Sequence, residues 1–221
     1  MPIPDLVIDR LPQYARVLAS LDDQGRDVVS SQEFAELLGR RGDGADRPWS
    51  AAQVRKDLSY FGRFGKQGRG YNVRKLLDEL RTILGLNRQW RMAVVGIGRL
   101  GHAILGYQGF TPQGFRIVEA FDSSPDLIGQ GVDGLMVRNT VDLEAVLREN
   151  RVDIGIVAVP AEAAQSVIEA LVRCGVRAIL NYAPISARVP KNVQIRHVDP
   201  VLALQSMTYY LKAGATLEQA R

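Results

Sequence analysis

The chain has 221 residues, of which 46% are apolar and 24% charged, a composition ordinary for a folded water-soluble protein of one or two domains. No apolar run approaches the length of a membrane span, and residues 1–6 lack the basic region and apolar core of a secretory signal. We therefore expect a cytoplasmic protein with no membrane partner. The single cysteine, Cys174, excludes an internal disulfide framework and disfavours redox sensing by thiol chemistry.

The net charge of +4 is unevenly distributed along the chain. Residues 55–75 hold seven lysines and arginines against one aspartate, so this segment alone carries more than the excess of the whole chain. Clustered positive charge of this kind is typical of a surface that binds nucleic acid.

Residues 1–86 are expected to form three helices, a hairpin and a closing helix. Apolar residues recur at helical spacing over residues 7–22. Pro12 is tolerated only in the first turn of a helix, so the first helix is predicted to begin near Leu11. The closing helix is predicted to begin after Asn72.

Two serines predict the starts of the second and third helices. Ser30 and Glu33 form a capping box before a helix expected over residues 31–40. After a stretch of loop composition, Ser50 is the predicted N-cap of the third helix, with Gln53 in the reciprocal capping position.

The third helix has one apolar face and one polar face. Ala51, Val54, Leu58 and Phe61 fall on one side at helical spacing, so this side is expected to pack on the two preceding helices. The opposite side carries short or hydrogen-bonding groups suited to the major groove of DNA, and the candidate DNA contacts are Gln53, Arg55, Lys56, Ser59 and Tyr60. The alternative is an amphipathic helix whose polar face is only solvated.

Glycines alternate with cations directly after this helix. Gly65, Gly68 and Gly70 allow the backbone to turn sharply, while Lys66 and Arg69 project from the tip, as in the wing of a winged-helix domain. The hairpin therefore favours the DNA-binding interpretation, and we add Lys66, Gly68 and Arg69 to the candidate contacts.

From residue 87 onward, strand and helix patterns alternate, which predicts an α/β domain with a doubly wound parallel sheet. Strands are expected at Met92–Val95, Phe115–Phe121, Asp153–Val159, Ala178–Leu180 and Val193–Val198, and helices at Leu100–Tyr107, Val141–Glu149 and Glu162–Arg173. A last apolar helix, Val201–Lys212, has no further strand to cover. Such a helix often docks on a second subunit.

A dinucleotide-binding fingerprint follows the first of these strands. It runs through Gly96, Ile97, Gly98, Arg99, Leu100 and Gly101, and Asp122 lies 21 residues past the last glycine. The glycines permit a tight turn, close approach of the pyrophosphate and close packing of the helix, whose N-terminus favours phosphate. Because the Asp122 carboxylate would bind the ribose hydroxyls and repel a 2′-phosphate, we expect NADH and NAD+ rather than NADPH.

Other interpretations of these residues remain open. Asp122 could be a turn residue before Ser123, and Arg99 could be solvated rather than bound to phosphate.

Two further strand ends are expected in the same crevice, near the nicotinamide: Val159-Pro160 and Asn181-Tyr182-Ala183-Pro184. The only histidines, His102 and His197, are more typical of structural residues than of catalysts. No catalytic residue and no metal site is predicted.

The chain carries both a predicted DNA-binding helix with a wing and a dinucleotide-binding fingerprint. This combination suggests a regulator whose ligand is a redox metabolite. An NAD-dependent oxidoreductase is disfavoured, because residues 87–221 are about enough for a cofactor domain alone. A coenzyme A-binding module is disfavoured by Asp122, which would repel the 3′-phosphate side of that ligand.

Eight short motifs follow one another along the chain: Gln53-Val-Arg-Lys-Asp-Leu-Ser-Tyr-Phe-Gly62, Gly68-Arg-Gly-Tyr71, Leu84-Gly-Leu-Asn87, Gly98-Arg-Leu-Gly101, Val159-Pro160, Ala163-Ala-Gln165, Ile179-Leu-Asn181 and Val198-Asp199. In these motifs and their order, the chain resembles the Rex family of redox-sensing transcriptional repressors over nearly its whole length. Two departures are the long loop from Gly39 to Trp49 and Pro200, where some members have phenylalanine.

The resemblance implies a homodimer with three parts: a winged-helix DNA-binding domain over 1–86, a Rossmann NAD(H)-binding domain over 87–199, and a C-terminal helix over 200–221 exchanged between subunits. It implies binding to inverted-repeat operator DNA when NADH is scarce and release when NADH rises. It also implies an allosteric switch through Arg16, Tyr107 and Asp199. The alternative is that Arg16 and Asp199 are ordinary surface charges.

Overall fold

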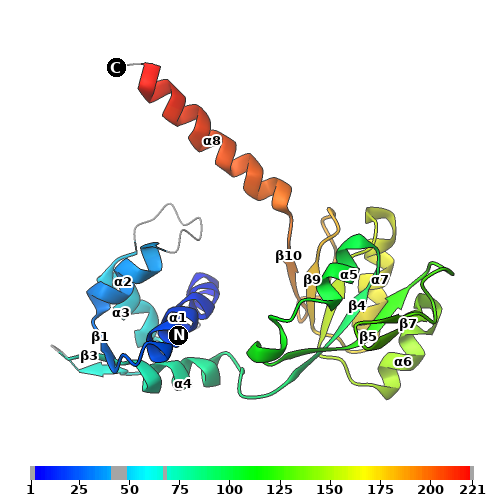
Figure 1. The fold of residues 1–221 in the computed structure, drawn as a ribbon, viewed down its shortest axis with the longest axis horizontal. Coiled ribbons are helices and arrows are strands. Elements are labelled where there is room, and N and C mark those ends of the chain that lie inside the picture. Colours follow the sequence, from blue (N-terminus) through cyan, green and yellow to red (C-terminus); the bar gives the residue numbers. More distant parts are fainter. Residues whose placement is uncertain (1–2, 41–48, 67–68, 220–221) are drawn as a thin grey trace. The chain divides into compact units, whose positions relative to one another are not determined.

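The structure is a computed structural model that describes residues 3–40, 49–66 and 69–219. The long loop expected before the third helix lies largely outside the described residues. The chain divides into two compact units, Met1–Arg88 (unit 1) and Gln89–Arg221 (unit 2), which are described separately (Figure 1).

Unit 1 is a bundle of helices with a small antiparallel sheet. Its elements are α1 (Asp5–Asp23), β1 (Val28–Val29), α2 (Ser31–Arg40), α3 (Ala51–Ser59), β2 (Gly65–Lys66), β3 (Gly70–Asn72) and α4 (Val73–Ile83). The strands lie in the order β1-β3-β2, so β2 and β3 form the expected wing and β1 extends it. Leu18, Phe34, Val54 and Leu76, one from each helix, are fully or almost fully buried in a common core.

The start of α1 differs from the prediction. The helix begins at Asp5 and contains Pro12 in its interior, rather than beginning near Leu11. Val7 is buried on the same face as Leu11, so packing favours helix upstream of the proline. Pro12 itself is exposed, and there water can bind the Ile8 carbonyl that proline leaves without an N–H donor.

The predicted helix caps are present, but the reciprocal half of each capping box is not. The hydroxyl oxygens of Ser30 and Ser50 accept hydrogen bonds from the backbone N–H groups of Glu33 (3.0 Å) and Gln53 (3.1 Å). The Glu33 carboxylate binds Arg26 instead of reaching back to its cap. The Gln53 amide likewise points along α3, where it donates to Asp57.

Unit 2 contains a seven-stranded sheet of order β10-β9-β8-β4-β5-β7-β6. Its strands are β4 (Trp90–Val95), β5 (Phe115–Asp122), β6 (Gly131–Val132), β7 (Leu135–Asn139), β8 (Ile154–Val157), β9 (Ala178–Asn181) and β10 (Gln194–His197). All pairs are parallel except β6 with β7. The expected doubly wound sheet is therefore confirmed.

The hairpin of β6 and β7 was missed in the sequence. Its turn is Asp133-Gly134, and both residues have positive φ, at 48° and 80°. An Asp-Gly pair with this conformation is a strong local signal for a two-residue hairpin turn. The flanking strands are short, so the alternation of side chains gave too weak a signal there.

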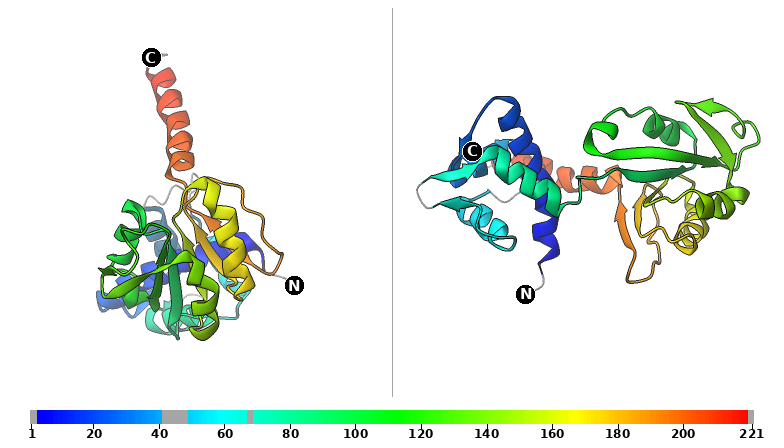
Figure 2. Two further views of the ribbon diagram at one scale, coloured as in Figure 1. Left: turned by 90° about the vertical axis from the view of Figure 1, so that its right-hand side faces the viewer. Right: turned by 90° about the horizontal axis from the view of Figure 1, so that it is seen from below.

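Helices cover both faces of the sheet (Figure 2). They are α5 (Arg99–Leu105), α6 (Leu143–Glu149) and α7 (Ala161–Arg173), with 3-10 turns η1 (Thr111–Gln113) and η2 (Thr140–Asp142). Met92 and Val94 of β4 pack with α5 on one face, while Ala93 and Val95 pack with α6 and α7 on the other. Because β4 is the central strand of the seven, its end and the start of α5 lie at the middle of the sheet.

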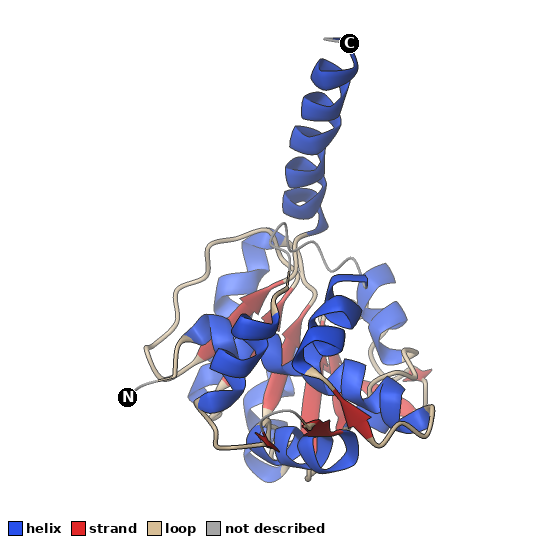
Figure 3. Ribbon diagram, turned by 90° about the vertical axis from the view of Figure 1, so that its left-hand side faces the viewer, coloured by secondary structure: helices blue, strands red, loops and turns tan. Residues whose placement is uncertain are grey.

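The last helix, α8 (Pro200–Gln219), follows β10 and extends the predicted segment in both directions (Figure 3). Six of its large apolar side chains are more than half exposed: Val201, Leu202, Leu204, Met207, Tyr209 and Leu211. Within the described ranges, no helix is long and apolar enough to cross a membrane.

Candidate functional site

The glycine-rich turn between β4 and α5 is held by two close backbone approaches. Gly96 has a φ of 94°, and a Cβ atom there would lie 2.5 Å from the Ala158 carbonyl oxygen. A Cβ atom on Gly101 would lie 1.8 Å from the Gly96 carbonyl oxygen. A Cβ atom on Gly98, by contrast, would meet nothing within 4 Å. The first and third glycines thus shape the turn, and the second leaves open space where a pyrophosphate could approach.

Asp122 lies at the end of β5 and binds this turn. One carboxylate oxygen accepts a hydrogen bond from the Ile97 N–H at 2.6 Å, and the other accepts from the Ser124 N–H at 2.7 Å. The bond to Ser124 shows that the turn role considered in the sequence is real. It does not exclude ribose binding, because a carboxylate can accept about four hydrogen bonds in total.

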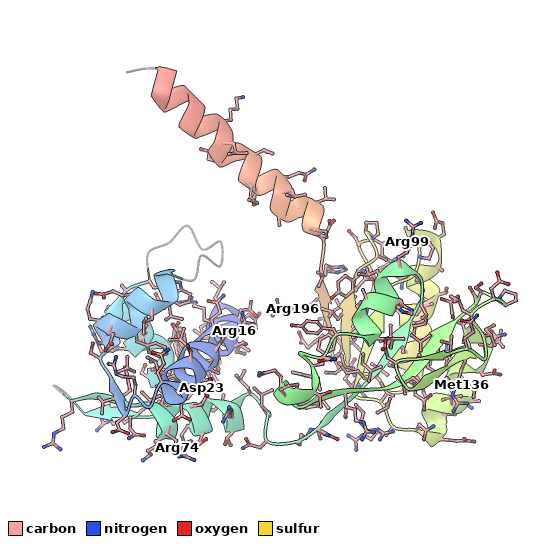
Figure 4. All side chains as sticks on the ribbon, viewed as in Figure 1. Arg16, Asp23, Arg74, Arg99, Met136 and Arg196 are labelled. Atoms are coloured by element: carbon pink, nitrogen blue, oxygen red, sulfur yellow. The ribbon has the colours of Figure 1, made fainter. Side chains whose placement is uncertain are left out.

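A cleft of about 740 Å³ opens beside the turn, over the carboxyl ends of β4, β5 and β8. Strand order reverses at β4, with β5 on one side and β8 on the other, and ligands of doubly wound sheets bind at such a switch point. Of the residues predicted to bind the cofactor, Gly96, Gly98, Arg99, Leu100, Asp122, Val159 and Pro160 line the cleft. Arg99 lies at the N-terminal end of α5 (Figure 4).

Part of the cleft wall was not predicted from the sequence. The additional lining residues are Ser123, Thr140, Val141, Leu143, Ala158, Ala163, Ser166, Val167 and Ala170. Ser123 follows β5, Ala158 follows β8, and the others come from η2, the start of α6 and the side of α7 beside its buried face. Val141 is 80% exposed. An exposed valine beside a cleft offers an apolar surface for a flat ring such as adenine.

The loop after β9 is fixed by the buried amide of Asn181. Its oxygen accepts from the Ala183 N–H at 3.0 Å, its nitrogen donates to the Ala183 carbonyl at 2.9 Å, and the same nitrogen lies 3.1 Å from His197 Nδ1. Asn181, Tyr182, Ala183 and Pro184 are not among the lining residues of the cleft described above. The Asn181 amide shapes the loop rather than presenting itself to the cleft.

The two histidines and the cysteine are not among the residues that line the cleft. His102 and His197 are both exposed, and the described part of the chain holds no cluster of three potential metal ligands. Burial is the main cause that raises the pKa of the Cys174 thiol, which keeps it in the protonated form. This agrees with the expected inert thiol.

In unit 1, the candidate DNA contacts of α3 lie mainly on its exposed side. Arg55, Lys56 and Ser59 are exposed, whereas Gln53 and Tyr60 are half-buried. Arg55 donates a hydrogen bond to the Ser31 hydroxyl at 2.8 Å, which connects α3 to the start of α2. Arg69 of the hairpin is exposed, while the Lys66 side chain and Gly68 lie outside the described residues.

A groove of about 680 Å³ separates α3 from the hairpin. Its lining residues are Ser30, Ser31, Arg55, Leu58, Ser59, Gly62, Arg63, Phe64, Gly65, Gly70 and Tyr71. Arg63, which was not among the predicted contacts, adds a second cation to this groove. The hairpin's close approach to β1 requires glycine, because a Cβ atom on Gly70 would lie 2.5 Å from the Val29 carbonyl oxygen.

The acid of α3, Asp57, is fully buried, which the sequence analysis did not foresee. One oxygen accepts from Arg10 Nη1 (2.9 Å) and from the Tyr14 hydroxyl (2.7 Å), and the other accepts from the Gln53 amide nitrogen. Burial, followed by the hydrogen bond to Asp57, raises the pKa of Tyr14, so its hydroxyl remains a donor. Asp57 falls between Val54 and Leu58 on the inner side of α3, and this helical spacing was the signal from which its burial could have been predicted.

The predicted switch residues lie in different units. Arg16 is exposed on α1 (Figure 4). Tyr107 is 60% exposed just after α5, and its ring meets that of Phe110 edge-on at 4.9 Å. Asp199 accepts a hydrogen bond from the Val201 N–H at 2.9 Å, so it caps α8.

Known protein families match both units. A model described as "Putative DNA-binding protein N-terminus" matches residues 2–59, and one described as "CoA binding domain" matches residues 87–185. The "Redox-sensing transcriptional repressor Rex" of Roseiflexus sp. (strain RS-1) is 52% identical over 208 residues, which cover 94% of this chain and 90% of the relative. The chain belongs to the Rex family of redox-sensing transcriptional repressors. Rex 1 of Thermotoga maritima is 42% identical, with 94% of this chain and 95% of the relative covered.

Solved Rex-family structures share this fold. The structure of RSP in complex with beta-NAD+ and operator DNA has a TM-score of 0.89 at 35% identity, and covers 99% of this chain and 97% of that one. The structure of RSP in complex with beta-NADH has a TM-score of 0.86 at 32% identity, with full coverage of both chains. An N-terminal DNA-binding domain followed by a Rossmann-like sheet is thereby confirmed.

Proposed function

We propose that this protein is a cytoplasmic homodimeric repressor that binds inverted-repeat operator DNA when NADH is scarce and releases it when NADH rises. The observation that carries the proposal is the presence in one chain of a basic helix with a wing and of a glycine-lined cleft at the switch point of a parallel sheet. The relatives that bind operator DNA, NAD+ and NADH support it.

The glycine turn fits a dinucleotide. Gly98 leaves open space at the start of α5, so the phosphates can reach the backbone N–H groups there. Asp122 lies where the adenine ribose would bind, and η2 supplies an apolar wall for the base. NADH and NAD+ are therefore the proposed ligands.

The exposed apolar side chains of α8 support the proposed homodimer. Exposed apolar patches of this kind mark protein interaction sites, and a helix exchanged between two copies would cover them. Because the proposed operator is an inverted repeat, a twofold-symmetric dimer would place one winged-helix domain on each half-site.

Two rival functions are disfavoured. The relatives are named transcriptional repressors rather than oxidoreductases. The family model over residues 87–185 carries the name of a coenzyme A-binding domain, but the Asp122 carboxylate would repel the 3′-phosphate of that ligand. The discriminating experiment is operator binding at fixed salt, with NADH, NAD+, NADPH and coenzyme A each titrated. The proposal is supported if NADH releases the operator at a lower concentration than NAD+, NADPH or coenzyme A does. Release by coenzyme A alone would overturn it.

We expect Asp122→Asn to lower NADH affinity and to narrow the preference for NADH over NADPH. The variant keeps the shape of the side chain but removes the charge that repels a 2′-phosphate, and it forfeits one of the two backbone hydrogen bonds. Fluorescence titration with both cofactors measures the effect. Equal affinity of the unmodified protein for NADH and NADPH would contradict the proposed role of Asp122.

We expect Arg55→Ala or Lys56→Ala to weaken binding to a cognate inverted repeat more than to random duplex, by about 1–3 kcal/mol for a lost bidentate base contact. Lys66 of the wing, a predicted phosphate contact, provides the comparison with these two residues of α3. Lys66→Ala should weaken both duplexes alike and flatten the salt dependence, because phosphate contacts carry no sequence information. Gel-shift titrations at several salt concentrations separate the two behaviours. Unchanged affinity in all three variants would argue against DNA binding by unit 1.

We propose that Tyr107 and Asp199 take part in the switch with Arg16, so that Tyr107→Phe and Asp199→Asn reduce the NADH-dependent loss of operator affinity. A ligand can drive release only through different affinities for two arrangements of the protein. Asp199→Asn is preferable to alanine, because its amide oxygen can still cap α8. The measurement is operator affinity with and without saturating NADH. Full release in both variants would remove these residues from the mechanism.

A further inference from the structure

Asp57 controls which atoms of Gln53 are available for contacts outside unit 1. The carboxylate is fully buried beneath α3, where its oxygens accept hydrogen bonds from Arg10, Tyr14 and Gln53. The atom of Gln53 that meets Asp57 is therefore the amide nitrogen, as the geometry has it. The carbonyl oxygen of the same amide, Gln53 Oε1, is left facing away from the carboxylate.

From this arrangement we infer that Asp57 is a positioning residue for sequence recognition, which fixes Gln53 as a hydrogen-bond acceptor toward the DNA bases. The bases that Gln53 would favour are those with an exocyclic amino group in the major groove, adenine with N6 or cytosine with N4. Guanine and thymine present the O6 and O4 acceptors at the same level, and would be disfavoured. The inference rests on the proposed function, in which α3 enters the major groove.

The position of Gln53 on α3 suits this role. It is the third residue of the helix, and the N-terminal residues of a recognition helix are those that contact base edges. Its side chain is half-buried, between the inner face that carries Val54 and the exposed face that carries Lys56. The amide can thus be held from below by Asp57 while its other edge remains accessible.

Without Asp57, the Gln53 amide would have no fixed direction. A glutamine amide can rotate by half a turn to exchange its oxygen and nitrogen, and could then pair with either an amino base or a keto base. Beside the Asp57 carboxylate that pairs with Arg10, that rotation places the carbonyl oxygen of Gln53 against a carboxylate oxygen, so two acceptors face each other and a hydrogen bond is lost. Arg10 and Tyr14 hold the carboxylate from α1, so the first helix takes part in base selection through Asp57.

The test uses the full-length protein and an operator selected by the protein itself from a random duplex pool. Each adenine and cytosine of one half-site is replaced in turn by an analogue without the exocyclic amino group, deoxynebularine for adenine and 2-pyrimidinone deoxyriboside for cytosine. We expect one position at which removal of the amino group weakens binding about five- to tenfold, as for one hydrogen bond. At that position the Gln53→Ala protein should no longer distinguish the analogue from the natural base.

The Asp57→Asn variant tests the role of the carboxylate. Its amide can either donate or accept, so Gln53 becomes free to turn, and the preference for an amino base over a keto base at that position should fall toward none. Binding to random duplex and the thermal unfolding midpoint show whether this variant is folded. If it is not, the comparison of Gln53→Ala with the unmodified protein across the analogues still shows whether Gln53 acts as an acceptor toward one base, and a negative result there overturns the inference.

Each outcome is distinguishable. If the unmodified protein and Gln53→Ala respond alike to every analogue, Gln53 does not read an amino group and the inference is overturned. The same holds if a folded Asp57→Asn protein keeps its full preference for the amino base. Failure to select any operator would instead contradict the proposed function.

Discussion

Gly101→Ala is expected to destabilise unit 2 and to abolish NADH binding. The added Cβ atom would lie 1.8 Å from the carbonyl oxygen of Gly96, which belongs to the backbone of the same tight turn. A flexible side chain could move away from such a contact, but this carbonyl is held between β4 and α5. Overpacking usually costs ~1–3 kcal/mol, and a backbone clash places this variant at or above the upper end of that range.

Two other glycine-to-alanine variants serve as controls for Gly101→Ala. Gly131 is exposed in β6 and would accept a Cβ atom with nothing within 4 Å, so Gly131→Ala should keep both stability and NADH affinity. Gly98→Ala also meets nothing within 4 Å, but its methyl group would enter the space left for the pyrophosphate. It should lower NADH affinity while leaving stability unchanged.

Unfolding can be followed separately in unit 2, because Trp90 begins β4 and the other tryptophan, Trp49, belongs to unit 1. In a Trp49→Phe background, thermal unfolding monitored by fluorescence reports on the sheet. Fluorescence titration with NADH then gives the affinity of each variant. A Gly101→Ala protein with the stability and NADH affinity of Gly131→Ala would show that the close approach at the turn is not required.

The cofactor turn could be predicted from the sequence because its requirements are local. Gly96 has a positive φ, and a Cβ atom on Gly101 would meet the Gly96 carbonyl oxygen five residues earlier, so the glycine spacing alone indicates the turn. The close approach of Gly96 to the Ala158 carbonyl depends on the packing of β4 beside β8 and could not be predicted in this way. The other wall of the cleft could not be predicted in this way. Val141 and the α7 residues Ala163 and Val167 reach the cleft only through the order of the strands, which the sequence does not state directly.

The misplaced start of α1 has a different physical reason. The local preference against proline in a helix interior was correct, but burial of the apolar face outweighed it at a site where the exposed Pro12 costs least. The β6–β7 hairpin is a different case, because here the local signal agreed with the structure. The Asp133-Gly134 pair indicates a hairpin turn, but the strand pattern on either side was too weak for the hairpin to be predicted.

The buried ion pair of unit 1 joins residues that are far apart in the sequence. Asp57 is 47 residues from Arg10 and 43 from Tyr14, so no motif could reveal that these side chains meet. The spacing on α3 indicated a buried position but not what would compensate the charge. Polar pairs of this kind can be recognised only once the helices are packed.

Asp57→Ala is therefore expected to destabilise unit 1 by about 3–5 kcal/mol, the usual cost of removing one partner from a buried ion pair. The variant leaves the hydroxyl of the fully buried Tyr14 without its acceptor. The Arg10 side chain is 25% exposed, so water can solvate part of its charge when Asp57 is removed. The loss of stability should therefore fall in the lower half of that range. Weakening of α3 would also reduce operator affinity.

Tyr14→Phe is the matched control for Asp57→Ala. It removes only the hydroxyl and keeps the ring that packs on Phe34 and Trp49, at centroid distances of 5.5 and 5.6 Å. Because Asp57 would retain Arg10 and Gln53, the loss should be smaller, about 1.5–3 kcal/mol for a hydrogen bond to a charged group. In a Trp90→Phe background, Trp49 fluorescence reports urea unfolding of unit 1. Equal stability of Asp57→Ala and the unmodified protein would mean that the carboxylate does not stabilise the fold, whereas a loss larger than that of Tyr14→Phe identifies Asp57 as the centre of the network.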